Sequence, residues 1–110
     1  MALSEQVHEI YRDDKLCYIQ YETNFMDKGG SHVTYCYDIS NKTYTDVSSC
    51  YFKLMRYELL EDERHDLLSR IAKSYQCELF DHELRSNKPE QLLQAMMAVC
   101  AWIEFKGVKL

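Results

Sequence analysis

Apolar and polar residues alternate along two stretches in the first half of the chain. The odd positions of residues 17–25 and 33–39 are mostly aromatic or aliphatic, and most even positions between them are polar. A period of two is typical of strands that bury one face of a sheet. We predict two antiparallel strands, joined at residues 26–31 by a loop in which Gly29 and Gly30 are free to take positive φ.

A second tight turn at residues 40–42 leads into a third β-rich stretch at residues 43–47. The three stretches together predict a three-stranded antiparallel meander. Residues 48–57 fit two interpretations: a helix capped by Ser48 or Ser49, or a continuation of the third strand. Periodicity does not decide between them.

The N-terminal residues show a different spacing, which indicates a short helix. Ser4 is a candidate N-cap, and the helix is expected to end near Asp13 and Asp14, which suit a turn. The apolar residues that share its face are Leu3, Val7, Ile10 and Tyr11.

The second half of the chain predicts two further helices. One starts near Glu61 and has an apolar stripe; the other starts at Asn87-Lys88-Pro89 and runs to about Phe105, before Gly107. Residues 77–84 form a connector or a short element. The stripe of the first of these helices consists of Leu60, Leu67, Leu68, Ile71 and Tyr75.

These elements predict a single α+β domain that comprises residues 1–110. The meander has an N-terminal helix and two C-terminal helices packed on one face. A length of 110 residues is close to the commonest domain size.

The five cysteines and the N-terminus indicate a cytoplasmic protein with reduced thiols. The cysteines are widely spaced and odd in number, which does not fit a disulfide scaffold. The N-terminus lacks the basic and apolar regions of a signal peptide. The longest apolar run, residues 91–103, is too short to span a bilayer, so we expect no membrane association.

The net charge of −5 is confined to one segment of the chain. Residues 58–83 contain eight acidic and three basic residues, whereas the remainder balances at ten of each. Such segregation favours a surface for a basic partner, and the lack of a basic stripe argues against direct nucleic-acid binding. The residues expected to contact a partner are Glu58, Glu61, Asp62, Glu63, Asp66, Tyr51 and Tyr57.

We therefore expect a non-enzymatic protein-binding module. The form favoured is a small acidic inhibitor, an immunity-type or anti-defence factor, or a chaperone that occupies a basic surface of its target. A nucleic-acid-binding target would have its phosphate site occupied by the carboxylates, in the manner of a nucleic-acid mimic. A homo-oligomer formed through a sheet edge is a further expectation, because a meander leaves two edges to be paired or covered.

The alternative is a small hydrolase or nuclease that uses a metal or a histidine. His65-Asp66 and His82 are its candidate residues, but companion ligands with suitable spacing are missing from the sequence. The cysteines and histidines also lack the close-spaced pairs of a zinc site. A Cys77–His82 pair would have its thiol pKa raised by the neighbouring acids. We expect no metal, no cofactor and no catalytic residue.

Overall fold

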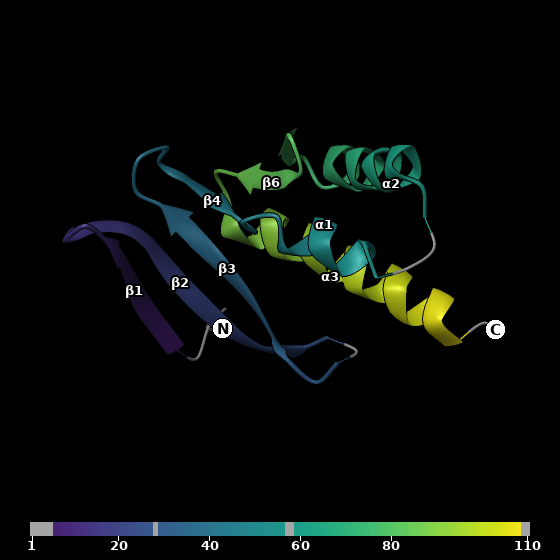
Figure 1. Ribbon diagram of the computed structural model, residues 1–110, viewed down its shortest axis with the longest axis horizontal. Coiled ribbons are helices and arrows are strands. Elements are labelled where there is room, and N and C mark those ends of the chain that lie inside the picture. Colours follow the sequence, from purple (N-terminus) through teal and green to yellow (C-terminus); the bar gives the residue numbers. More distant parts are fainter. Residues whose placement is uncertain (1–5, 28, 57–58, 109–110) are drawn as a thin grey trace.

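A computed structural model describes residues 6–27, 29–56 and 59–108 (Figure 1). Within these residues an antiparallel sheet of six strands has the order β1-β2-β3-β4-β6-β5 and is combined with three helices. The α+β class is therefore confirmed. The elements are β1 (Gln6–Arg12), β2 (Lys15–Met26), β3 (His32–Asp38), β4 (Thr43–Thr45), α1 (Ser49–Leu54), α2 (Glu61–Ser74), β5 (Glu78–Phe80), β6 (Glu83–Ser86) and α3 (Pro89–Val108).

The predicted N-terminal helix is wrong, because β1 occupies most of that stretch. It pairs with β2 from Gln6↔Glu22 to Arg12↔Lys15. The two residues between the strands, Asp13 and Asp14, have φ values of 53° and 64°. Positive φ at both central residues is the requirement of a type I′ hairpin turn, and aspartate tolerates it better than most residues. The acids expected to end a helix instead connect two strands.

The predicted meander is present as β2, β3 and β4, but it is only the middle of the sheet. β1 extends it on one edge, and the β5–β6 hairpin extends it on the other through the pair Tyr44↔Ser86. The hairpin lies where only a connector or a short element was expected. The predicted sheet of three strands therefore contains half of the six strands that the structure shows.

Tyrosines of the three meander strands pack together on one face of the sheet: the odd-numbered Tyr21, Tyr35 and Tyr37 of β2 and β3 meet the even-numbered Tyr44 of β4. The rings of Tyr21 and Tyr35 stack with centroids 5.1 Å apart, and Tyr37 meets Tyr44 edge-on at 5.0 Å. Tyr35 is buried, whereas the other three are half-buried. Aromatic pairs of this kind on neighbouring strands stabilise a sheet beyond the area that they bury.

Residues 48–57, for which strand and helix were both open, begin with helix α1. The acceptor at its start is the side chain of Asp46, and not a hydroxyl of Ser48 or Ser49. Asp46 accepts hydrogen bonds from the backbone N–H groups of Ser48 at 2.9 Å and Cys50 at 3.2 Å. Ser48 itself has a φ of 67°, a left-handed conformation that turns the chain out of β4.

Helices α2 and α3 confirm the two predicted C-terminal helices, and α3 continues to Val108, slightly beyond the expected end. Their inner faces join β3, β6 and α1 in the hydrophobic core. The fully buried apolar side chains of this core are Val33, Cys50, Leu54, Leu68, Leu84, Leu92, Ala95 and Val99, with Met96 almost as buried. Of the described helices, none is long and apolar enough to cross a membrane.

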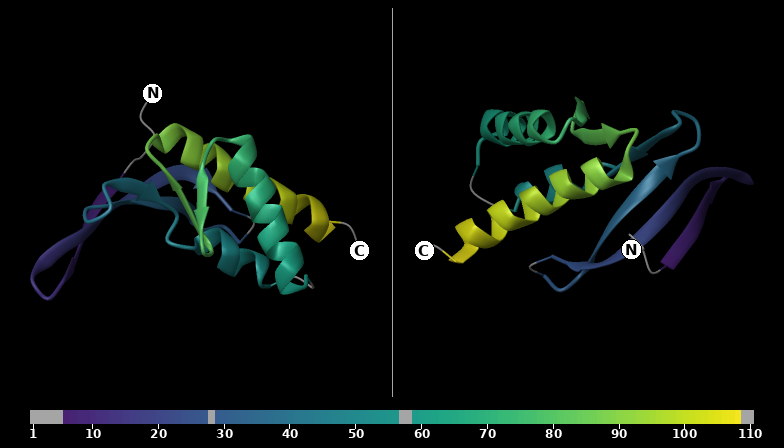
Figure 2. Two further views of the ribbon diagram at one scale, coloured as in Figure 1. Left: turned by 90° about the horizontal axis from the view of Figure 1, so that it is seen from above. Right: turned by 180° about the vertical axis from the view of Figure 1, so that it is seen from behind.

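Strands β1 and β2 extend away from the helices as an arm, which Figures 1 and 2 show from several sides. Residues 7–15 are exposed along its outer part. The helices lie together at the other side of the molecule, where α2 packs against both α3 and β5.

Candidate functional site

The acidic start of α2 is built by local physical chemistry. Glu61, Asp62 and Glu63 occupy the first turn, where negative charge is favoured by the helix dipole. The carboxylate of Glu63 accepts the backbone N–H of Leu60 at 2.8 Å, which is one half of a capping box. Glu63 therefore has a structural role, while the carboxylates of Glu61 and Asp62 make no such contact within the described residues.

The β5–β6 hairpin brings His82 to this part of α2. Asp81 and His82 form its two-residue turn, in which Asp81 has a φ of 57°. The imidazole of His82 stacks on the ring of Tyr51 with centroids 3.8 Å apart and an interplanar angle of 13°. Because Tyr51 is buried in α1, this stack fixes the position of the imidazole.

The groove between α2 and the hairpin has a volume of about 400 Å³. We call it the acidic groove. Its three carboxylates and two imidazoles belong to residues that were predicted for two different functions, partner binding and hydrolysis. Its lining residues are Glu61, Asp62, His65, Asp66, Ser69 and His82.

The electrostatics of the acidic groove favour a cationic group. Asp66 forms an ion pair with Arg70 at 2.7 Å, but both side chains are largely exposed, so water screens the pair. Among the described residues, neither Glu61 nor Asp62 forms an ion pair. The Nδ1 atom of His82 is buried without a hydrogen-bond partner in the described part of the chain. An ammonium or guanidinium group would find several acceptors here.

The structure brings together only some of the residues expected to contact a partner. Glu61, Asp62 and Asp66 line the acidic groove, and Glu63 is exposed beside it. Tyr51 is only 7% exposed and supports His82 from below. The two remaining residues, Tyr57 and Glu58, lie outside the described residues.

The residues of the alternative hydrolase also meet in the acidic groove. His65 and Asp66 face it from α2, and His82 faces it from the hairpin. Over the described ranges, however, no three His, Cys, Asp or Glu residues are arranged to hold a metal ion.

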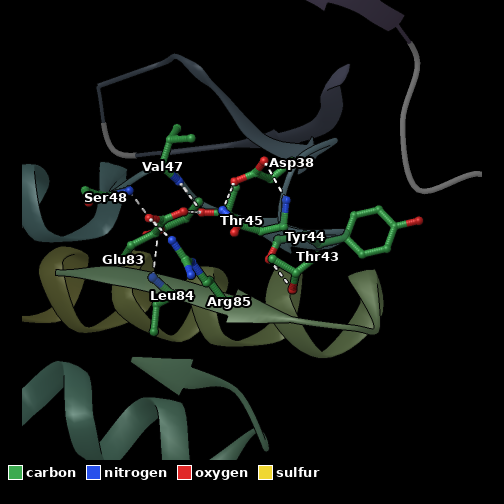
Figure 3. A network of polar contacts seen from close by, with 11 residues as sticks. Asp38, Thr43, Tyr44, Thr45, Val47, Ser48, Glu83, Leu84 and Arg85 are labelled. Atoms are coloured by element: carbon green, nitrogen blue, oxygen red, sulfur yellow. Dashed lines mark hydrogen bonds and ion pairs between the residues drawn. The ribbon is translucent and has the colours of Figure 1, made fainter. Parts of the chain in front are cut away.

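A polar network that the sequence analysis missed holds the hairpin in position (Figure 3). The carboxylate of Asp46, completely buried, accepts the backbone N–H of Leu84 on β6 at 2.9 Å in addition to its two bonds at α1. On the same hairpin, Glu83 accepts a hydrogen bond from Thr45 and pairs with Arg85 at 3.1 Å. A signal for Asp46 exists in the sequence, since it lies two residues before Ser48, and aspartate is a common acceptor for the backbone N–H groups at a helix start.

Burial raises the pKa of four of the five thiols. The pKa of Cys36 and that of Cys77 rise to about 11, and those of Cys50 and Cys100 are raised as well. Only the thiolate is a good nucleophile, so about one molecule in a thousand carries a reactive Cys36 at pH 8. These four thiols are therefore poorly suited to catalysis at neutral pH.

We predict that these four cysteines react slowly with Ellman's reagent at pH 8 in the folded protein and rapidly in guanidinium chloride. The free energy of unfolding should also fall as the pH rises from about 8.5 to 11, because unfolded thiols ionise in that range while the folded ones keep their protons. Equal rates of all five thiols with and without denaturant would contradict the prediction.

Comparison of the chain with protein-family models, with curated proteins and with solved structures finds no match. The functional conclusion therefore depends on the geometry and charge of the acidic groove.

Proposed function

We propose that this protein is a non-enzymatic binding module that captures a basic surface of a partner protein in the acidic groove. The observation that supports the proposal is the convergence of Glu61, Asp62 and Asp66 with His82 around one groove. A lysine or arginine side chain of the partner would enter the groove, where the carboxylates accept its hydrogen bonds beside the rigid imidazole of His82.

The charge distribution supports capture as well as binding. The groove carboxylates belong to residues 58–83, which carry the net charge of −5, whereas the rest of the chain is neutral. Clustered charge of one sign steers an oppositely charged partner and raises its association rate. An inhibitor, an immunity-type factor or a chaperone would use such a surface, and a nucleic-acid-binding target would offer its phosphate site.

The test is affinity capture from the native host with a variant that neutralises the groove. Glu61→Gln, Asp62→Asn and Asp66→Asn remove three charges and leave the cap residue Glu63 unchanged. We expect recovery of the partner to fall at least tenfold, because the attraction that speeds association and holds the bound side chain is lost.

A matched control removes three charges from the arm. Glu9→Gln, Asp13→Asn and Asp14→Asn change the net charge equally, and asparagine tolerates the positive φ of the turn. Recovery should stay at the level of the unmodified protein. Equal losses in both variants would show that only net charge matters, and no loss in the groove variant would refute the proposal.

The convergence of His65, Asp66 and His82 also favours a second candidate, a metal- or histidine-dependent hydrolase or nuclease. Metal analysis of the purified protein separates the two functions. A stoichiometric ion that His82→Ala releases would support the enzyme, and capture that persists after chelation supports the binding module.

A further inference from the structure

Helix α3 buries one face in the core and also carries apolar residues on its outer side. Leu92, Met96, Val99 and Ile103 recur at helical spacing and are buried. A surface helix usually carries polar residues on its other side. The opposite side of α3 combines the half-buried Met97 and Ala98 and the exposed Ala101 with the exposed Gln94. In the view from behind, α3 lies in front of the other helices (Figure 2).

The outer side of α3 forms the floor of a groove of about 700 Å³. Phe25 on β2 forms part of its wall, and Tyr75 at the end of α2 contributes as well. A smaller groove shares Tyr75 and Ala98 and continues toward Trp102; its lining also includes the charged Arg70. We call the larger one the α3 groove: Phe25, Tyr75, Glu90, Leu93, Gln94, Met97, Ala98 and Ala101 line it.

Each end of the outer side of α3 carries an acid. Glu90 lies in the first turn of α3 and Glu104 lies near its other end, and both are exposed. Fourteen residues of helix separate them by about 21 Å. In the described part of the chain neither acid has an ion-pair partner. The α3 groove is thus mainly apolar apart from Gln94, with Glu90 at one end, and Glu104 lies on α3 beyond its lining residues.

This charge pattern selects among the possible occupants. A second copy packed antiparallel would place Glu90 against Glu104 of the other copy. A copy packed parallel would place each acid against the same acid of the other copy. Like charges in such contacts are unfavourable. An anionic lipid surface would be repelled for the same reason. An amphipathic helix with basic residues at its ends matches both the apolar floor and the acidic ends.

We propose that the α3 groove binds a basic amphipathic helix of a partner protein. The small side chains of Ala98 and Ala101 allow a close approach, and the exposed Phe25 together with the half-buried Met97 supplies apolar contact, as in helix-in-groove recognition. This surface is additional to the acidic groove and does not depend on the function proposed for it.

The probe is a synthetic 18-residue helical peptide without tryptophan, with leucine and alanine on one face, lysine at both ends of that face and glutamine on the other face. Trp102 is the only tryptophan of the chain and lies beside the groove, so its fluorescence reports binding. We expect micromolar affinity at low salt. A peptide with glutamate in place of lysine should bind at least tenfold more weakly.

Variants assign the binding to the α3 groove. Ala101→Arg places bulk and positive charge on the floor and should weaken the lysine peptide at least tenfold. Ser40→Arg adds the same charge at the exposed turn between β3 and β4 and should have no effect. Reversing both ends with Glu90→Lys and Glu104→Lys should transfer the preference to the glutamate peptide. Circular dichroism checks that each variant is folded.

The inference is wrong if the lysine peptide does not bind, if both peptides bind equally, or if Ala101→Arg binds normally. A dimer that Ala101→Arg dissociates would identify a second copy as the occupant, and binding to phosphatidylglycerol vesicles in place of the peptide would identify a membrane. Loss of peptide binding only in the Glu61→Gln, Asp62→Asn, Asp66→Asn variant would place the peptide in the acidic groove instead.

Discussion

Replacing Asp46 with alanine is expected to lower the free energy of unfolding by about 4 kcal/mol. The carboxylate accepts three backbone N–H groups, from Ser48, Cys50 and Leu84. Each donor would remain in the interior without a partner, at a cost of about 1–3 kcal/mol. Because Asp46 joins β4, α1 and β6, the substitution should also loosen the hairpin that positions His82.

Denaturant unfolding followed by circular dichroism measures this effect. Asp46→Asn is the control, because its carbonyl oxygen can still accept the two bonds made by Oδ1 and only the bond to Cys50 is lost. The free energy of unfolding of Asp46→Asn should fall clearly less than that of Asp46→Ala. An alanine variant that loses less than about 1 kcal/mol would contradict the role assigned to Asp46.

Replacing Leu84 with alanine is expected to cost about 3 kcal/mol. Leu84 is completely buried on β6 beneath the helices, and the substitution leaves a cavity that the packed neighbours fill only in part. The same substitution at Leu60, which is 73% exposed, should cost less than about 0.5 kcal/mol.

Leu84→Ala and Leu60→Ala are compared by their denaturant midpoints, provided that the free energy of unfolding depends equally steeply on denaturant concentration in both variants. Similar midpoints for Leu84→Ala and Leu60→Ala would mean that β6 does not belong to the cooperative core. In that case the hairpin would not be a rigid wall of the acidic groove.

The alternation of the middle strands predicted their β-structure correctly, and over part of β3 it corresponds to burial: Val33 and Tyr35 lie in the core, and Thr34 between them is half-buried. Near the end of β3 the even-numbered Cys36 and Asp38 are also buried, so burial there is not confined to one face. The same reasoning failed for β1, where Val7, Ile10 and Tyr11 are all exposed. An apolar spacing that does not correspond to burial carries no information about secondary structure, so the helical interpretation had no physical basis there.

The β5–β6 hairpin was too short to be recognised. Its strands of three and four residues give at most two alternations, too few to distinguish a strand from a loop. Its pairing with β4 bridges about 40 residues of sequence, and such a contact depends on the tertiary fold.

The acidic residues of the site were predictable, whereas the groove was not. Glu61 and Asp62 follow from the charge pattern at a helix start. The opposing His82 comes from a hairpin whose position depends on Asp46 and on the stack with Tyr51. Tyr51 was expected on the surface because aromatic residues are common at interfaces, but its ring packs inside.

Hydrogen exchange of the protein with and without its captured partner tests the central claim most directly. If the acidic groove is the binding surface, protection on binding should concentrate in residues 61–69 and 81–83, and it should weaken at high salt. Protection confined to the β1–β2 arm or to α3, with none at these two segments, would contradict the claim.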